Sequence, residues 1–275
     1  MKTLTIALAT AKQAVRKPAF LVLSAFASFL LIGTIYVPYF TLGEDIKMYK
    51  DTGLTMISFF SLLLALLTAS SEVAEEIEGR TAITLLSKPI NRRQFILGKF
   101  LGIELAVLAM FAILGTLFAG GVWYKYAYDL TESGGGATAE MAMRIKQVQQ
   151  VLPGLVLGFC EVTILTSISV AISTRVPMLP NLVVCLSLFF LGHLSPVMVE
   201  ATKPGSGANE LVRFMAGFFA FLLPPLENYN AGPSIATGVM VPWGVYVLPV
   251  VGLCVLYSSA ALFFAFLLFD NRDVA

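Results

Sequence analysis

The chain has 275 residues, of which 57% are hydrophobic and only 13% charged, and its formal net charge is +1. Soluble domains average about 45–50% apolar and about 25% charged residues, so this composition indicates an integral membrane protein. The near-neutral charge argues against a nucleic-acid-binding surface. Cys160, Cys185 and Cys254 all lie in apolar runs without CxxC spacing, which predicts small buried side chains rather than disulfides.

The N-terminal segment 1–18 is basic and partly amphipathic. Its apolar residues alternate with Lys2, Lys12, Arg16 and Lys17, and Pro18 follows. This pattern predicts an interfacial helix that lies along the inner leaflet of the membrane. The alternative is a frayed terminus that is held near the membrane by its charge alone.

Six apolar runs are each near or above the roughly 20 residues that a helix needs to cross about 30 Å of hydrocarbon. They predict transmembrane helices at residues 19–40, 53–71, 98–122, 152–174, 178–198 and 244–269. The expected fold is therefore an all-α integral membrane protein, with residues 1–275 forming one transmembrane domain.

The segment 72–94, between the second and third predicted spans, is polar. Glu72, Glu75 and Glu76 are spaced to share one helix face, and Gly79 is a natural helix end that allows a sharp reversal. A short helix is predicted to follow, roughly parallel to the membrane, and Pro89 ends it.

The third predicted span begins with its own helix-start signal. Asn91 is placed as an N-cap, and Gln94 three residues later completes a capping-box pattern. From these residues alone, the segment 72–94 could equally be an ordinary charged hairpin loop that only fixes topology.

The distribution of Lys and Arg predicts that both termini are cytoplasmic. In that orientation, inner segments hold eleven of these residues: Lys2, Lys12, Arg16, Lys17, Arg80, Lys88, Arg92, Arg93, Lys99, Arg175 and Arg272. Outer segments hold the other seven: Lys47, Lys50, Lys125, Arg144, Lys146, Lys203 and Arg213.

Two segments on the predicted outer side are not expected to cross the membrane. The loop 125–151 contains Gly134, Gly135 and Gly136, and a short external helix is predicted from Thr138 to Val151. Within the external or re-entrant segment 199–243, the apolar stretch 211–226 is short for a span and stops at two prolines. It is expected to be re-entrant or interfacial.

Several motifs together resemble one family. The run Glu75-Glu76-Ile77-Glu78-Gly79-Arg80-Thr81, followed by Leu85-Leu86-Ser87-Lys88-Pro89-Ile90, Arg92-Arg93 and Gly98-Lys99, resembles the segment between the second and third helices of type-2 ABC transporter permeases. The tail stretches Leu223-Pro224-Pro225-Leu226-Glu227-Asn228-Tyr229-Asn230 and Phe269-Asp270-Asn271-Arg272-Asp273 also resemble motifs of these permeases.

The resemblance implies that segment 72–94 contains a coupling helix, which seats in a groove of a nucleotide-binding subunit. The residues implied in coupling to that ATPase subunit are Glu75, Glu76, Gly79, Arg80, Ile83, Leu85, Leu86, Lys88, Pro89 and Arg92. The sequence contains no G-x-x-x-x-G-K-[ST] motif, so this chain is expected to bind no cofactor and to catalyse no reaction. ATP and Mg²⁺ are expected in the partner subunit.

The function implied by the resemblance is that of a permease subunit of an ATP-driven exporter in the cytoplasmic (inner) membrane. Its expected partners are an ATP-binding cassette subunit, a second permease copy or a related permease, and the lipid bilayer. The alternative is a non-transporting membrane scaffold that anchors a soluble ATPase or an envelope-assembly partner.

Three residues of the fourth predicted span form a second candidate site. Glu161 lies well inside the apolar run, and a carboxylate there costs about 2.5–3.5 kcal/mol on insertion scales. Gly154 and Gly158 share its helix face and form a small-residue packing stripe. These residues are predicted to lie in the translocation path or at a dimer seam; the alternative for Glu161 is a protonated packing residue.

Two other polar residues within the spans are given structural roles. Glu104 is expected to reach the inner interface or to pair with a neighbour. His193 is the only histidine and has no potential metal-binding partners at suitable spacing.

Overall fold

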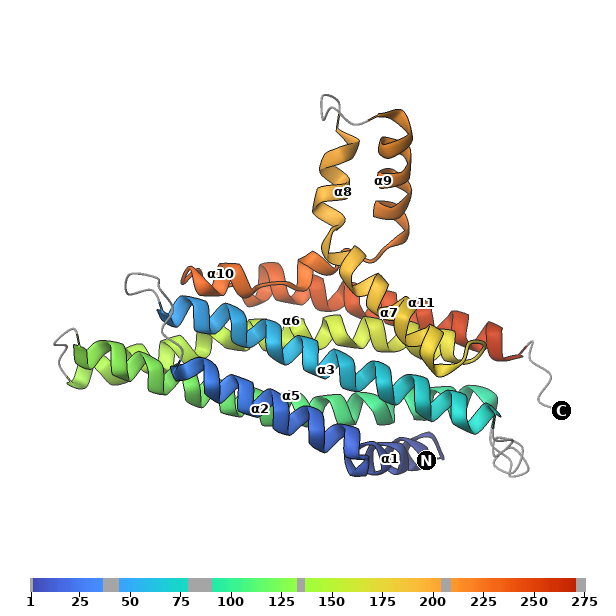
Figure 1. Ribbon diagram of the computed structural model, residues 1–275, viewed down its shortest axis with the longest axis horizontal. Coiled ribbons are helices and arrows are strands. Elements are labelled where there is room, and N and C mark those ends of the chain that lie inside the picture. Colours follow the sequence, from blue (N-terminus) through green and yellow to red (C-terminus); the bar gives the residue numbers. More distant parts are fainter. Residues whose placement is uncertain (1, 37–44, 79–90, 133–136, 204–208, 271–275) are drawn as a thin grey trace.

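Helices make up all the regular structure that the computed structural model describes, which covers residues 2–36, 45–78, 91–132, 137–203 and 209–270 (Figure 1). Their order is α1 (Lys2–Arg16), α2 (Pro18–Tyr36), α3 (Asp45–Glu78), α5 (Arg92–Glu132), α6 (Ala137–Ser173), α7 (Met178–His193), α8 (Ser195–Thr202), α9 (Glu210–Leu222), η1 (Leu226–Tyr229), α10 (Gly232–Ala236), η2 (Trp243–Val247) and α11 (Leu248–Asp270). The predicted all-α class is confirmed.

Five helices are long and apolar enough to cross a membrane. They are Pro18–Tyr36, Asp45–Glu72, Arg93–Tyr128, Met141–Ser173 and Trp243–Phe269. The pair Met178–His193 and Ser195–Thr202 passes the same test as a sixth span only if the two bent helices are taken together. The described residues therefore hold five spans or six, where the sequence predicted six.

The predicted fifth span is not one straight helix. The chain bends by 55° between α7 and α8, at Leu194. Pro196 follows two residues later, in the first turn of α8, where a missing N–H is tolerated at a helix start but not in a helix interior. The expected helix over 178–198 therefore ends at His193.

The expected external helix from Thr138 to Val151 is part of a longer element. It is continuous with the fourth span, because α6 runs unbroken from Ala137 to Ser173 through Pro153. Two of its polar residues have a partner in α3, since the Lys50 ammonium donates hydrogen bonds to the side-chain oxygens of Gln147 and Gln150. This contact joins the N-terminal part of α6 to the bundle.

The apolar stretch 211–226 forms most of α9, which ends at Leu222, before the two prolines. Helices α8 and α9 lie side by side as a hairpin that points away from the long axis of the bundle (Figure 1). The hairpin carries exposed apolar side chains, of which Phe221 is the most exposed at 90%. Its placement relative to a membrane stays a prediction.

Helix α1 packs along α5 through small residues. Ala7, Thr10 and Ala14 are buried, while Leu4 and Leu8 are exposed on another face. Gly102 lets the backbones approach, because a Cβ there would lie 2.6 Å from the carbonyl oxygen of Ala7. The predicted N-terminal helix is thus present and amphipathic; its contact with lipid remains an expectation.

The neighbouring glycines Gly120 and Gly121 of α5 provide a test of the helix packing. A Cβ at Gly121 would overlap the Tyr49 hydroxyl and approach Ile35, whereas one at Gly120 meets nothing within 4 Å. Gly121→Ala is therefore expected to lower the free energy of unfolding by about 1–3 kcal/mol through overpacking. Gly120→Ala should be neutral or raise it by up to about 1 kcal/mol through helix propensity. Unfolding in mixed micelles measures both, and equal effects would contradict the close approach.

Candidate functional site

The predicted coupling segment is only partly inside the described residues. Glu75 and Glu76 lie in the last turns of α3, and Arg92 begins α5. The remaining predicted coupling residues lie outside the described residues: Gly79, Arg80, Ile83, Leu85, Leu86, Lys88 and Pro89. One of the two hydrogen bonds of the predicted capping box is present at the start of α5, since the Asn91 N–H donates a hydrogen bond of 3.4 Å to Gln94 Oε1.

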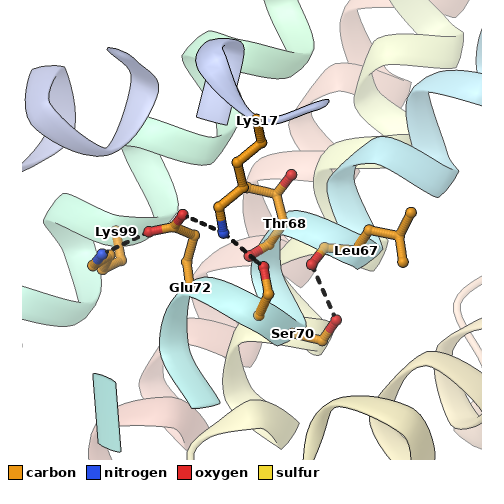
Figure 2. Close-up of polar contacts among 7 residues, drawn as sticks. Lys17, Leu67, Thr68, Ser70, Glu72 and Lys99 are labelled. Atoms are coloured by element: carbon orange, nitrogen blue, oxygen red, sulfur yellow. Dashed lines mark hydrogen bonds and ion pairs between the residues drawn. The ribbon is translucent and has the colours of Figure 1, made fainter. Parts of the chain in front are cut away.

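A buried charge cluster lies where α3 leads into this segment and α5 returns from it (Figure 2). Glu72 of α3 accepts a hydrogen bond of 3.0 Å from Lys99 of α5, through its Oε2. Its Oε1 lies 2.7 Å from the ammonium of Lys17, between α1 and α2. Lys17 also donates a hydrogen bond of 3.0 Å to the Ser71 hydroxyl. One carboxylate thus connects the α1–α2 junction with both helices that flank the predicted coupling segment.

Burial decides how strongly this cluster constrains the helices. The side chains of Glu72 and Lys99 are 1% and 4% exposed, and that of Lys17 is 27% exposed. A buried ion pair contributes little net stability compared with apolar residues, but removing one partner leaves an uncompensated charge. Any motion that separates the ends of α3 and α5 would therefore have to break a buried charge pair.

The sequence did not predict the contacts of Lys17 and Lys99 with Glu72. Both lysines were counted only as positive residues of the inner segments, and Lys99 also as part of the family motif. The pairs are separated by 55 and 27 positions. The available signal was weak: an acidic residue ends one apolar run, and a lysine lies near the start of the next.

A second site lies within the bundle, where the structure brings Gly154, Gly158 and Glu161 to one cavity of about 170 Å³. The cavity lies between α3, α6, α7 and the segment after η1. Its walls are Leu54, Thr55, Ser58, Gly154, Gly158, Glu161, Phe189, His193, Tyr229, Asn230, Ala231 and Gly232. Its wall includes Gly232, the first residue of α10.

The two glycines let α6 approach α3 and α10. A Cβ at Gly154 would lie 2.7 Å from Leu54 Cδ1 and 2.8 Å from Ile235 Cδ1. A Cβ at Gly158 would overlap the hydroxyl of Ser58, which lines the cavity. These contacts agree with the predicted small-residue packing stripe.

Glu161 lies inside the bundle and only 4% of its surface is exposed. Its Oε1 is buried without a hydrogen bond of good geometry from the described residues, and His193 Nε2 lies 3.3 Å away. The other ring nitrogen, Nδ1, is 3.2 Å from the backbone oxygen of Phe189. The histidine given a structural role from sequence therefore faces the candidate carboxylate.

Tyr229 completes the wall of the cavity as a neutral donor. Burial raises the pKa of its hydroxyl above the ordinary value, and the hydroxyl donates a hydrogen bond of 3.3 Å to the backbone oxygen of Val250. This bond holds the segment after α9 against α11.

Other polar and sulfur groups lie outside this cavity. Glu104 is 9% exposed and accepts a hydrogen bond of 3.0 Å from Thr163. Of the two roles expected for it, the structure shows pairing with a neighbour. The three cysteines are free and buried, as predicted. Within the described ranges, no three His, Cys, Asp or Glu residues are placed to hold a metal ion.

Comparison with known proteins gives one family. A family model described as "ABC-2 family transporter protein" matches residues 4–274, nearly the whole chain. No curated protein matches the sequence.

Proposed function

Because this chain belongs to the ABC-2 transporter family, whose model covers residues 4–274, we propose that it is the membrane-spanning subunit of an ATP-binding cassette exporter. The family match over nearly the whole chain carries the proposal. Membership makes the chain a multi-pass membrane component of a transporter. Export as the direction and the cytoplasmic (inner) membrane as the location are the finer parts of the proposal.

ATP and Mg²⁺ would be bound by a separate cassette subunit. The sequence has no phosphate-binding G-x-x-x-x-G-K-[ST] motif, and family membrane subunits typically lack an ATPase domain. A second permease copy or a related permease would complete the membrane part. This chain would then supply the passage and the docking segment, and its partner the hydrolysis.

The coupling segment 72–94 is the proposed docking element. The predicted anchors Ile83, Leu85 and Leu86, with charged Arg80 and Lys88 at their edge, have the composition of a compact interface. The buried Glu72 cluster supports this proposal, because it ties together the helices on both sides of the segment. Displacement of the segment by an ATPase subunit would then move α3 and α5 as one body.

The arrangement of the helix ends supports a cytoplasmic location for both termini. The ring of Phe95, near the start of α5, stacks 6.1 Å from that of Phe269, near the end of α11. Lys17, after α1, contacts Glu72. The described ends of the chain therefore lie at the same end of the bundle as the helices that flank the coupling segment (Figure 1). Labelling of a cysteine placed at Val274 from the ATPase side tests this orientation.

Gly154, Gly158 and Glu161 are proposed to belong to the translocation path rather than to a dimer seam. The observation that favours the path is the cavity that Glu161 lines within a single chain. The glycines would keep α6 close to α3 at this level.

The proposed function is tested by transport in inverted membrane vesicles that contain this chain and its cassette subunit. We expect cargo to accumulate in the vesicles with ATP and not with a non-hydrolysable analogue. Co-purification of a stable complex that moves no candidate cargo would instead favour the scaffold. Absence of any complex with a cassette subunit would reject the exporter and leave only a scaffold with another partner.

A further inference from the structure

The cavity at Glu161 offers hydrogen-bond acceptors without a fixed positive charge. Glu161 contributes a buried carboxylate oxygen, Ser58 a hydroxyl and Asn230 a side-chain amide. Among the residues that line the cavity there is no lysine or arginine. Buried carboxylates without a bonded partner are rare in proteins, and each calls for an explanation such as an absent ligand.

The contacts of His193 show where the proton of this site is held. A carbonyl oxygen can only accept, so the contact with Phe189 requires that Nδ1 carries a hydrogen. In the neutral ring, Nε2 is then an acceptor that faces Glu161 Oε1 at 3.3 Å. Two bare acceptors would repel at this distance, so one proton resides on the pair. Glutamate and histidine together are then electrically neutral.

The charged groups around the pair are mainly acidic. From η1, the half-buried Glu227 contacts the cavity wall, because its Oε1 accepts a hydrogen bond of 3.2 Å from the Asn230 side-chain amide. From α3, the carboxylate of Asp51 lies against Gly232 in the cavity wall. On α7, His193 is the titratable group that faces Glu161. A cation that enters this cavity would therefore meet an environment of favourable charge.

We propose that this cavity binds a protonated primary amine, which replaces the proton held between Glu161 and His193. The three N–H groups of an ammonium match three acceptors, namely Glu161 Oε1, the neutral His193 Nε2 and the Ser58 hydroxyl. The ring of Phe189 and the ring of Tyr229 add aromatic walls, which attract organic cations. The volume of about 170 Å³ admits a group the size of a short alkylamine.

Charge balance explains why an amine and a proton exchange in this site. When the ammonium enters, the proton leaves the pair for solvent and the site keeps the same net charge. The exchange therefore adds no uncompensated charge to a low-dielectric interior. Binding of the amine does not depend on the proposed function. A second step, in which the bound amine is part of the transported molecule, rests on the proposed function.

A thiol at the edge of the cavity reports on its charge selectivity. Thr55 lines the cavity and is exposed, so Thr55→Cys places the thiol there without removing a proposed ligand. The purified chain in nanodiscs, without nucleotide or ATPase subunit, is treated with 2-aminoethyl methanethiosulfonate or its neutral hydroxyethyl analogue. Relative to a free thiol, we expect about tenfold preference for the ammonium reagent, and we expect n-butylammonium to slow the neutral reagent.

Three comparisons distinguish binding of the ammonium reagent in the cavity from its attraction by charges elsewhere on the protein. Adding Glu161→Gln should bring the reagent preference to within about twofold of the free thiol. Adding Glu104→Gln, a matched substitution of a buried carboxylate outside the cavity wall, should leave it unchanged. Raising the pH within the range in which the reagent's amine stays protonated should increase the preference in the Thr55→Cys protein, because the competing proton is lost. This comparison needs no second substitution.

Several results would overturn the proposal. They are an unselective thiol, equal effects of the two glutamine substitutions, or a preference that falls as the pH rises while the reagent's amine stays protonated. Because the assay contains no ATPase subunit, each of these leaves the transport proposal standing. Conversely, loss of ATP-driven transport in vesicles with retained amine selectivity would reject transport and keep the amine site.

Discussion

Replacing Glu72 with alanine is expected to lower the free energy of unfolding by about 3–5 kcal/mol. The substitution removes the carboxylate that contacts both Lys17 and Lys99. The Lys99 ammonium then loses a buried ion-pair contact, and because its side chain is 4% exposed, water does not readily replace that contact. The effect should exceed that of Lys17→Ala, since Lys17 is partly exposed and Glu72 keeps Lys99 as a partner.

Unfolding in mixed micelles, followed by circular dichroism, measures these differences. The matched control is Glu200→Ala, which removes the carboxylate of an exposed ion pair with Lys203; it should change the free energy by no more than about 0.5 kcal/mol. The loss of unfolding free energy in Glu72→Gln should lie between those of Glu72→Ala and Glu200→Ala, because glutamine keeps hydrogen-bonding capacity but not the charge. An effect of Glu72→Ala as small as that of the control would show that the cluster does not hold the helices together.

Replacing both Leu85 and Leu86 with aspartate is expected to abolish or strongly weaken association with the cassette subunit. Each leucine is a predicted apolar anchor of the coupling segment, and loss of interface hot spots typically costs 2 kcal/mol or more each, or roughly 30-fold in affinity. Two buried aspartates would add an unpaired-charge penalty at the same interface. Membrane insertion should persist, because residues 79–90 lie between the predicted spans.

Co-purification with the cassette subunit and the rate of substrate-stimulated ATP hydrolysis measure this loss. The control replaces both leucines with methionine, which keeps the apolar character and volume and should retain most of the association. Unchanged association and ATPase activity in the aspartate variant would count against docking through this segment. The segment would then be a plain topological loop.

The positions of the five long apolar helices followed largely from hydropathy, because about 20 apolar residues are needed to cross a bilayer whatever the surrounding fold. Local signals also predicted helix ends: Asn91 and Gln94 form one of the two hydrogen bonds of the predicted capping box, and α9 ends just before the two prolines. The bend after His193 had its signal in Pro196, but the apolar run continued through it and hid the break. The opposite occurred at α6, where the polar residues before the fourth apolar run were predicted as a separate helix, although the helix is continuous from Ala137 to Ser173.

The family motifs and the spacing of Gly154, Gly158 and Glu161 were also readable in the sequence, because residues on one helix face follow a fixed period. Tertiary structure alone decided which partners these faces meet. Glu72 gained Lys17 and Lys99, and Glu161 gained His193, across separations that no helical period encodes. A buried charge must find an opposite charge or a proton wherever packing brings one near, so such pairs are determined by how the helices assemble.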